Sequence, residues 1–252
     1  MWYAFPGLPT QSRSIRFRPW LLPEGCARVW PDPNEAEPGE GLVAVGADLD
    51  ADRLISAYAH GIFPWYNEDT PILWWSPEPR AIVERQGLHV SRSLRRQLRR
   101  RDFSLRSDTD FEGVIDGCAD RSEGTWLLPE MRSAYLHLHA LGLAHSIEVW
   151  EAGQLTGGLY GVQVGGLFAA ESMFHRATDA SKVALVSAVC SLFGAGFQLF
   201  DVQFMTAHLA SLGATEIPRN QYLARVIEVQ SVRVRWDNVA STLEDPGFLS
   251  AV

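Results

Sequence analysis

A β-strand, a long apolar helix and a second β-strand are predicted between Gly165 and Gln203, and this unit constrains the fold more than any other stretch. The first strand covers Leu167 to Ser172, the helix Ser181 to Phe193, and the second strand Phe197 to Gln203. A right-handed crossover through the helix places two such strands in one sheet. The chain is therefore expected to contain parallel strands covered by their own connecting helix.

Three polar side chains stand near the ends of these two strands. Glu171 is near the end of the first strand, and Asp201 and Gln203 are near the end of the second. The crossover brings them to neighbouring positions on one sheet. Two carboxylates and an amide in so apolar a setting need hydrogen-bond partners or a ligand. We expect Glu171, Asp201 and Gln203 to form a reaction centre.

The composition is that of a globular protein. The chain has 252 residues, of which 46% are hydrophobic and 21% charged, with a formal net charge of -8. This length suits one large domain or two modest ones, and the composition excludes a wholly disordered chain. A net negative charge argues against indiscriminate nucleic-acid binding, although it is an average that leaves room for a local basic face.

The cysteines and the first residues indicate a reducing, cytoplasmic setting. Cys26, Cys118 and Cys190 are far apart and form no C-x-x-C pair, so neither a zinc site nor a disulfide framework is predicted. Prolines and arginines interrupt the first twenty residues, so no export signal is expected, and residues 1–28 are expected to be a loosely packed extension. The apolar run 183–200 contains polar residues and fits a buried helix and strand better than a membrane span.

A helix predicted within residues 91–103 combines an apolar side with a strongly basic one. Leu94 and Leu98 share the first side. The opposite side carries five arginines: Arg92, Arg95, Arg96, Arg99 and Arg100. A solvated helix face usually explains a run of charges, but such faces mix signs and none of these positions is acidic. The pattern favours a phosphate-rich partner.

Trp65, Trp74 and Trp75 lie within eleven residues and among four prolines. Two interpretations compete. The tryptophans form a proline-braced core, which is the commoner case, or one of them offers a rigid surface on which an unstacked nucleic-acid base stacks.

The predicted helix from Pro129 to Gly142 contains two histidines. His137 and His139 lie on opposite flanks of its apolar stripe, so they do not jointly bind a metal from this helix. We interpret both as surface or edge residues. No metal site is predicted.

A hairpin precedes the strand-helix-strand unit. Its strands are predicted at 145–150 and 154–164, with the turn at 151–153. Hairpin, strand, helix and strand in this order are typical of GNAT-like acyltransferases, although a fold alone does not establish a function. Acetyltransferases of this fold hold the cofactor pyrophosphate in a glycine-rich loop before the helix. The corresponding segment here, MFHRATDASK, has no glycine, which counts against acetyl-CoA.

Ten motifs, in their order along the chain, closely resemble the leucyl/phenylalanyl-tRNA–protein transferase family. The resemblance covers roughly residues 29–223. The motifs are GLVAVGADL, GIFPWY, ILWWSPEPRA, EGTW, HSIEVW, GGLYGV, ESMF, ASK, DVQ and HLASLGATEIPR.

This resemblance implies an α+β fold with a small N-terminal α/β domain at 29–79 and a GNAT-like acyltransferase domain at 80–252. It implies transfer of leucine or phenylalanine from Leu-tRNA or Phe-tRNA to proteins that begin with Arg or Lys, which marks them for N-degron proteolysis. It implies no cofactor and no membrane partner. We expect a monomer, because no heptad repeat suggests coiled-coil assembly.

The resemblance also assigns residues by matching position. Asp201, Gln203 and Glu171 are implied as the catalytic residues. The tRNA phosphates are implied to contact Arg92, Arg96, Arg99 and Arg100. The implied substrate-binding residues are Trp65, Trp126, Tyr135, Leu159, Phe168 and Phe174.

Two departures from the family pattern leave these three catalytic positions unchanged. Ala47 replaces a commonly seen glycine, and Leu159 stands where methionine is frequent. A change at Leu159 is expected to affect the preference between leucine and phenylalanine, and not the reaction class.

Two competing functions are weaker. A CoA-dependent N-acetyltransferase requires the phosphate loop that is missing here. A non-catalytic tRNA-binding protein explains the arginines and leaves Glu171, Asp201 and Gln203 without a purpose.

Overall fold

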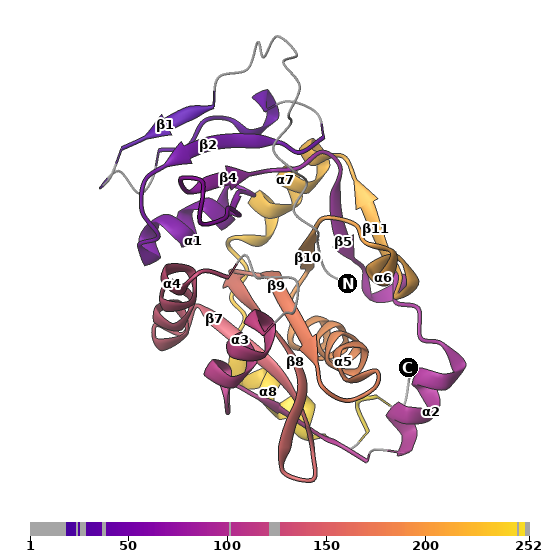
Figure 1. Cartoon of the computed structure of the whole chain (residues 1–252). Helices are drawn as coiled ribbons and strands as arrows, with labels where there is room; N and C mark the ends of the chain where they lie inside the picture. The colour runs from indigo at the N-terminus through magenta and orange to yellow at the C-terminus, as the bar shows by residue number, and fades with distance from the viewer. Residues whose placement is uncertain are drawn as a thin grey trace.

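The computed structural model describes residues 19–23, 25, 29–36, 39–100, 102–120, 127–245 and 247–249. These residues form a mixed α/β structure with two sheets, the smaller built near the N-terminus and the larger from the rest of the chain (Figure 1). Most of the extension predicted at 1–28 lies outside the described residues.

The predicted strand-helix-strand unit is confirmed. Strand β9 spans Leu167–His175, helix α5 spans Ala180–Ala195 and strand β10 spans Leu199–Gln203. The two strands are parallel neighbours, with Asp201 beside Ala169. Most residues of α5 are buried, because the helix packs on the larger sheet and against helix α8 (Figure 1). This burial explains why its sequence is apolar on all sides.

The larger sheet has seven strands in the order β11-β5-β10-β9-β8-β7-β6. Only the β9–β10 pair is parallel within this sheet. The other strands are β5 (Arg80–Val83), β6 (Ser104–Ser107), β7 (Ala144–Glu151), β8 (Gln154–Val164) and β11 (Ala214–Ile217). The predicted hairpin is therefore present as β7 and β8, whereas the sequence pattern did not identify β5 and β11 as strands.

The smaller sheet consists of short strands in the order β1-β2-β4-β3. They are β1 (Trp20–Leu22), β2 (Leu42–Gly46), β3 (Phe63–Pro64) and β4 (Leu73–Trp75). The Trp74 indole is fully buried and donates to the Gly46 carbonyl oxygen at 2.9 Å. Strands this short depend on packing around them more than on their own hydrogen bonds.

Helices cover both faces of the larger sheet. The remaining helices are α1 (Ala51–Ala59), α2 (Arg92–Arg100), α3 (Phe111–Ala119), α4 (Pro129–Ala140), α6 (Ala207–Ser211), α7 (Arg219–Val229) and α8 (Trp236–Glu244), with 3-10 turns at Pro33–Glu35 and Arg85–Gly87. One core cluster joins the smaller sheet, α1, α3 and α4 to one face of the larger sheet. A second cluster joins α2, α5 and α8 to the other face.

Arg219 at the start of α7 connects the two sheets. Its guanidinium donates to the carbonyl oxygens of Ser76 at 2.7 Å and Ala36 at 2.8 Å, and its backbone N–H donates to Glu78 at 2.8 Å. These groups come from the segment between β4 and β5 and from the region before β2. The start of α7 therefore holds the smaller sheet against the larger one.

Two of the three cysteines are described, and both are free thiols. Cys118 is buried and Cys190 is partly buried. Among the described residues, no helix is both long enough and apolar enough to cross a membrane.

Glycine at position 213 is predicted to be required for the turn into β11. Gly213 has φ of +93°, and an added Cβ would overlap the Gly87 carbonyl oxygen. Gly142 has φ of +70° but no atom within 4 Å of such a Cβ. Gly142→Ala should lower the free energy of unfolding by about 1 kcal/mol, the cost of left-handed backbone. Gly213→Ala should lower it distinctly more, as measured by urea denaturation; equal losses would contradict the packing described here.

Candidate active site

The structure brings together the three polar side chains predicted to form the reaction centre. The Gln203 amide nitrogen donates to a Glu171 carboxylate oxygen at 3.2 Å. The Gln203 backbone N–H donates to Asp201 Oδ1 at 2.9 Å. Glu171 and Gln203 retain 8% and 5% of their surface, whereas Asp201 is fully buried. Of the two carboxylates, Glu171 is thus the less completely buried.

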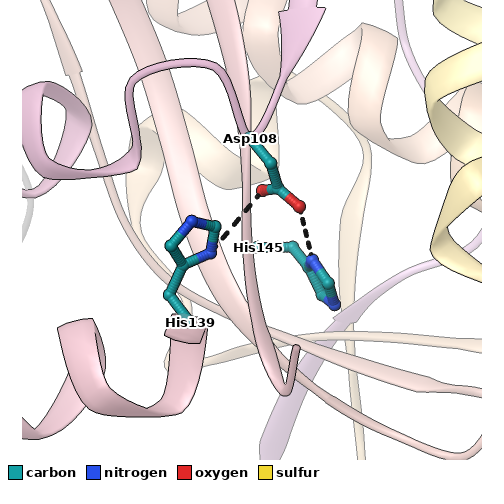
Figure 2. Close-up of side chains that lie close together, drawn as sticks. All are labelled: Asp108, His139 and His145. Atoms are coloured by element: carbon teal, nitrogen blue, oxygen red, sulfur yellow. Dashed lines mark hydrogen bonds and ion pairs between the residues drawn. The ribbon is translucent and has the colours of Figure 1, made fainter. Parts of the chain in front are cut away.

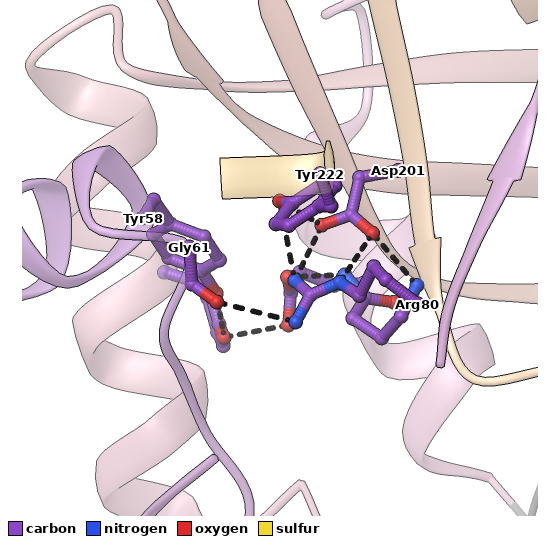
Figure 3. A network of polar contacts seen from close by, with 8 residues as sticks. Tyr58, Gly61, Arg80, Asp201 and Tyr222 are labelled. Atoms are coloured by element: carbon purple, nitrogen blue, oxygen red, sulfur yellow. Dashed lines mark hydrogen bonds and ion pairs between the residues drawn. The ribbon is translucent and has the colours of Figure 1, made fainter. Parts of the chain in front are cut away.

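Asp201 is paired with Arg80, which the sequence pattern did not identify as a site residue. Arg80 donates from Nε to Asp201 Oδ1 at 2.8 Å and from Nη2 to Oδ2 at 2.6 Å (Figure 3). Tyr222 on α7 donates its hydroxyl to Asp201 Oδ2 at 2.9 Å. Both Asp201 oxygens are therefore occupied by donors, and its charge is balanced by a guanidinium that is itself fully buried.

A bulge in β10 aims Gln203 at Glu171. The register against β5 shifts between Asp201 and Gln203, and Gln203 has φ of +55°. A left-handed conformation is unfavourable for a residue with a side chain, so it persists only where the surroundings impose it. Here the Asp201 carboxylate holds the Gln203 backbone N–H in place.

Two tyrosines hold the other side of Glu171. Tyr135 on α4 donates its hydroxyl to Glu171 Oε2 at 2.8 Å, and the hydroxyls of Tyr58 and Tyr135 are 2.8 Å apart. Burial raises the pKa of Tyr58 and of Tyr135 well above the ordinary value, which keeps both as neutral phenols. Tyr135, predicted to bind substrate, is fully buried and contacts Glu171; Tyr58 was not predicted as a site residue.

The environment of Glu171 brings its protonation into the neutral range. Burial raises the pKa of Glu171 to about 7, and the hydrogen bonds of Tyr135 and Tyr58 oppose this rise. The charge of Asp201 raises this pKa further, while that of Arg80 lowers it. A carboxylate with a pKa near 7 accepts and releases a proton readily at physiological pH.

The apolar residues predicted to bind substrate fall on both sides of the larger sheet. Trp65, Tyr135 and Phe174 belong to the core cluster on the α4 side. Leu159 and Phe168 belong to the cluster that packs against α5. The structure therefore does not bring these residues to one continuous surface. Trp126 lies outside the described residues.

Trp65 is connected to the reaction centre by Phe204, which was not predicted as a site residue. Its ring packs against Phe204, which directly follows Gln203, with ring centroids 5.4 Å apart. Trp65, Trp74 and Trp75 are all buried, with at most 6% of their surface exposed, which is the packing that the core interpretation predicts.

The arginines of α2 line an open groove, on a helix whose Leu94 and Leu98 are buried against the core as predicted. The groove has a volume of about 530 Å³ and is lined by Arg92, Arg95, Arg96, Arg99 and Arg100. We call these five residues the arginine groove. Arg100 forms an exposed ion pair with Asp102 at 2.7 Å, a contact of small energy in water.

Asp108, His139 and His145 form a polar cluster at the start of α3 (Figure 2). Their potential metal-binding atoms lie within 4.8 Å of one another. However, His145 Nδ1 bonds Asp108 at 2.6 Å, and His139 Nδ1 bonds the Ala144 carbonyl oxygen at 2.8 Å. When Nδ1 of a neutral imidazole donates to oxygen, Nε2 of the same ring keeps its lone pair, and His145 Nε2 is buried without a hydrogen-bond partner among the described residues. The Nδ1 hydrogen bonds connect α4 and the segment between β6 and α3 to β7, and sequence spacing did not reveal the cluster.

Comparisons with known proteins identify the family. The model of the leucyl/phenylalanyl-tRNA protein transferase matches residues 82–227, and that of its N-terminal domain matches residues 47–78. A protein named leucyl/phenylalanyl-tRNA–protein transferase from Anaeromyxobacter sp. (strain Fw109-5) is 53% identical over 215 residues, which are 82% of this chain and 91% of that one. A protein of the same name from Methylococcus capsulatus is 51% identical over 217 residues, 84% of this chain and 92% of that one.

A solved structure, that of L-PGS from Bacillus licheniformis, aligns with a TM-score of 0.37 at 12% identity, over 67% of this chain and 57% of that one. This similarity is too low to indicate a function. The family models and the curated relatives agree with each other over most of the chain. They confirm the resemblance seen in the sequence motifs: this chain belongs to the leucyl/phenylalanyl-tRNA–protein transferase family of aminoacyltransferases.

Proposed function

We propose that this protein transfers leucine or phenylalanine from aminoacyl-tRNA to the N-terminal α-amine of proteins that begin with Arg or Lys, and so marks them for N-degron degradation. It acts as a monomer in the cytoplasm, where its tRNA substrates are. The observation that carries the proposal is the Glu171 carboxylate, which is hydrogen-bonded by Gln203 and Tyr135 and whose pKa burial raises to about 7.

Glu171 has the properties of a proton acceptor for this reaction. The α-amine nitrogen bonds to the aminoacyl carbonyl carbon and loses a proton to Glu171, the ester bond to the tRNA ribose breaks, and the departing ribose oxygen takes up a proton to become a hydroxyl. The aminoacyl ester is already activated, so correct placement of the amine and removal of this proton are the main tasks. An α-amine has an ordinary pKa of about 7.7–8.0. A carboxylate with a pKa of about 7 is closely matched to it.

Gln203 and Asp201 act differently in this proposal. Gln203 donates its amide nitrogen to Glu171, which leaves its amide oxygen available to accept a hydrogen bond from the attacking amine. Asp201 is fully buried and paired with Arg80, so it contributes by holding the Gln203 backbone and does not contact the substrate.

The aromatic and apolar residues provide the substrate surfaces. We assign Trp65, Trp126, Tyr135 and Phe174 to the aminoacyl-adenosine end of the tRNA. Leu159 and Phe168, which are buried on the α5 side of the sheet, are assigned to an apolar pocket for the leucyl or phenylalanyl side chain only by their match to the family motifs. An apolar pocket discriminates only modestly by size, which suits an enzyme that accepts both amino acids.

The chain divides, in this proposal, into a small domain at 29–79 and a GNAT-like catalytic domain at 80–252. The antiparallel hairpin of β7 and β8, followed by β9, α5 and the parallel strand β10, supports the second assignment. The turn between β9 and α5 has no glycine, which supports an aminoacyl-tRNA donor over acetyl-CoA. No cofactor is needed for this chemistry.

Replacing Glu171 with glutamine is expected to reduce kcat at least about 100-fold, because an amide keeps the shape of the carboxylate but does not accept the proton. The measurement is steady-state transfer of leucine from Leu-tRNA to a peptide that begins with Arg. In the wild type, kcat/KM should rise with pH through about 7, as Glu171 loses its proton. In Glu171→Gln only the titration of the peptide amine should remain.

Glu216→Gln is the matched control, because Glu216 is an exposed carboxylate on β11. It should leave kcat and the pH profile unchanged. Unaltered kcat in a folded Glu171→Gln variant would exclude Glu171 as the proton acceptor.

Replacing Arg96 in the arginine groove with alanine is expected to weaken tRNA binding and to reduce its dependence on salt. One phosphate contact fewer lowers the slope of log K against log salt concentration by about 1. Binding of Leu-tRNA is measured by fluorescence anisotropy across a salt series. Arg235→Ala is the control, since Arg235 is an equally exposed arginine that pairs with Asp237. If both variants bind alike, the arginine groove is not the tRNA surface.

A further inference from the structure

Glu171 and Gln203 belong to a closed ring of hydrogen bonds. One branch runs from Tyr58 through Tyr135 to Glu171. The other branch runs from the Gly61 carbonyl oxygen to Arg80 Nη1 at 3.2 Å, and from Arg80 through Asp201 to Gln203.

The Gln203 amide closes the ring by bonding Glu171. Both branches start from the same segment, because Tyr58 and Gly61 are one helical turn apart at the end of α1 and their backbones are hydrogen-bonded. Figure 3 shows Tyr58 and Gly61 close together, with the Gly61 carbonyl oxygen bonded by Arg80. The end of α1 therefore fixes both partners of the reaction pair at once.

Arg80 is the residue on which the second branch depends. It is fully buried, and its guanidinium lies over the rings of Phe63 at 4.8 Å and Tyr222 at 4.4 Å. The guanidinium reaches Gly61 and both oxygens of Asp201 at once, which the single ammonium of a lysine does not reproduce.

Stability alone is a weak reason for such a pair. The free energy lost when two charges leave water is comparable to the energy gained from their attraction. A geometric role accounts for it better. The left-handed Gln203 backbone depends on Asp201 Oδ1, and Arg80 sets where that oxygen lies.

We propose that Arg80 is a positioning residue for aminoacyl transfer: by orienting Asp201 and anchoring it to the Gly61 carbonyl, it holds the Gln203 amide against Glu171. This inference rests on the proposed roles of Glu171 and Gln203. It extends them to a residue that does not contact the substrate. It also connects the reaction pair to the segment that leads into β3 and Trp65, so substrate placement and the catalytic pair share one support.

The test is steady-state kinetics of full-length Arg80→Lys with Leu-tRNA and a peptide that begins with Arg. The variant keeps the positive charge and loses the bidentate geometry. It should lower kcat by about 10- to 100-fold, the scale of a small displacement of a reacting group. KM for Leu-tRNA should stay within about twofold, because the arginine groove is unchanged. The midpoint of the pH profile should also stay in place, since the charge near Glu171 is retained.

Arg225→Lys is the matched control. Arg225 on α7 forms a partly exposed ion pair with Glu84 at 2.5 Å, and its replacement should leave kcat unchanged. Tyr222→Phe is the second variant, for the case in which Arg80→Lys does not fold. It removes one donor from Asp201 and keeps the ion pair, so a smaller reduction of kcat at unchanged KM is expected.

The outcomes separate the two proposals. Wild-type kcat in folded Arg80→Lys and in Tyr222→Phe, together with a large loss in Glu171→Gln, overturns the positioning role and keeps the proposed function. No loss in Glu171→Gln overturns the proposed function itself. A rise in KM at unchanged kcat in Arg80→Lys also contradicts positioning, because it would place Arg80 in substrate binding.

Discussion

The buried ion pair between Arg80 and Asp201 is the interaction on which the rest of the site depends. It joins the neighbouring strands β5 and β10 of the larger sheet. Asp201 also accepts a hydrogen bond from the Tyr222 hydroxyl on α7, and Arg80 donates to the Gly61 carbonyl oxygen at the end of α1. Four elements thus meet at one pair of charges. Because that pair is shielded from water, its geometry is set by these partners. The Asp201 carboxylate, held in this way, fixes the Gln203 backbone in the bulge of β10.

In the proposed function, two sites of opposite charge have different tasks. The arginine groove on α2 collects positive charge in a chain whose net charge is -8, which suits a polyanionic substrate that must be held. Glu171 stands in an apolar setting that brings its pKa close to neutrality, which suits the handling of a single proton. In the proposed function, tRNA binding and chemistry are thereby assigned to separate residues on separate elements.

The sequence predicted those features that depend on local pattern. The strand-helix-strand unit, the hairpin and the two faces of α2 follow from apolar spacing within each segment, and the structure confirms them. Arg80 was missed because its partner Asp201 lies 121 positions further along the chain, although an arginine leading the apolar run RAIV was a signal of a buried partner. The separation of Leu159 from Trp65 by the sheet depends on strand pairing, which spacing alone does not give.

The most direct test of the account is the reaction itself, followed by mass spectrometry. The protein is mixed with Leu-tRNA and a peptide that begins with Arg, in parallel with a peptide that begins with Gly and with acetyl-CoA in place of the tRNA. We predict the addition of one leucyl residue to the N-terminus of the first peptide only. Tight binding of Leu-tRNA without any transfer, or acetylation of the peptide, would contradict the assignment of Glu171 and Gln203 to aminoacyl transfer.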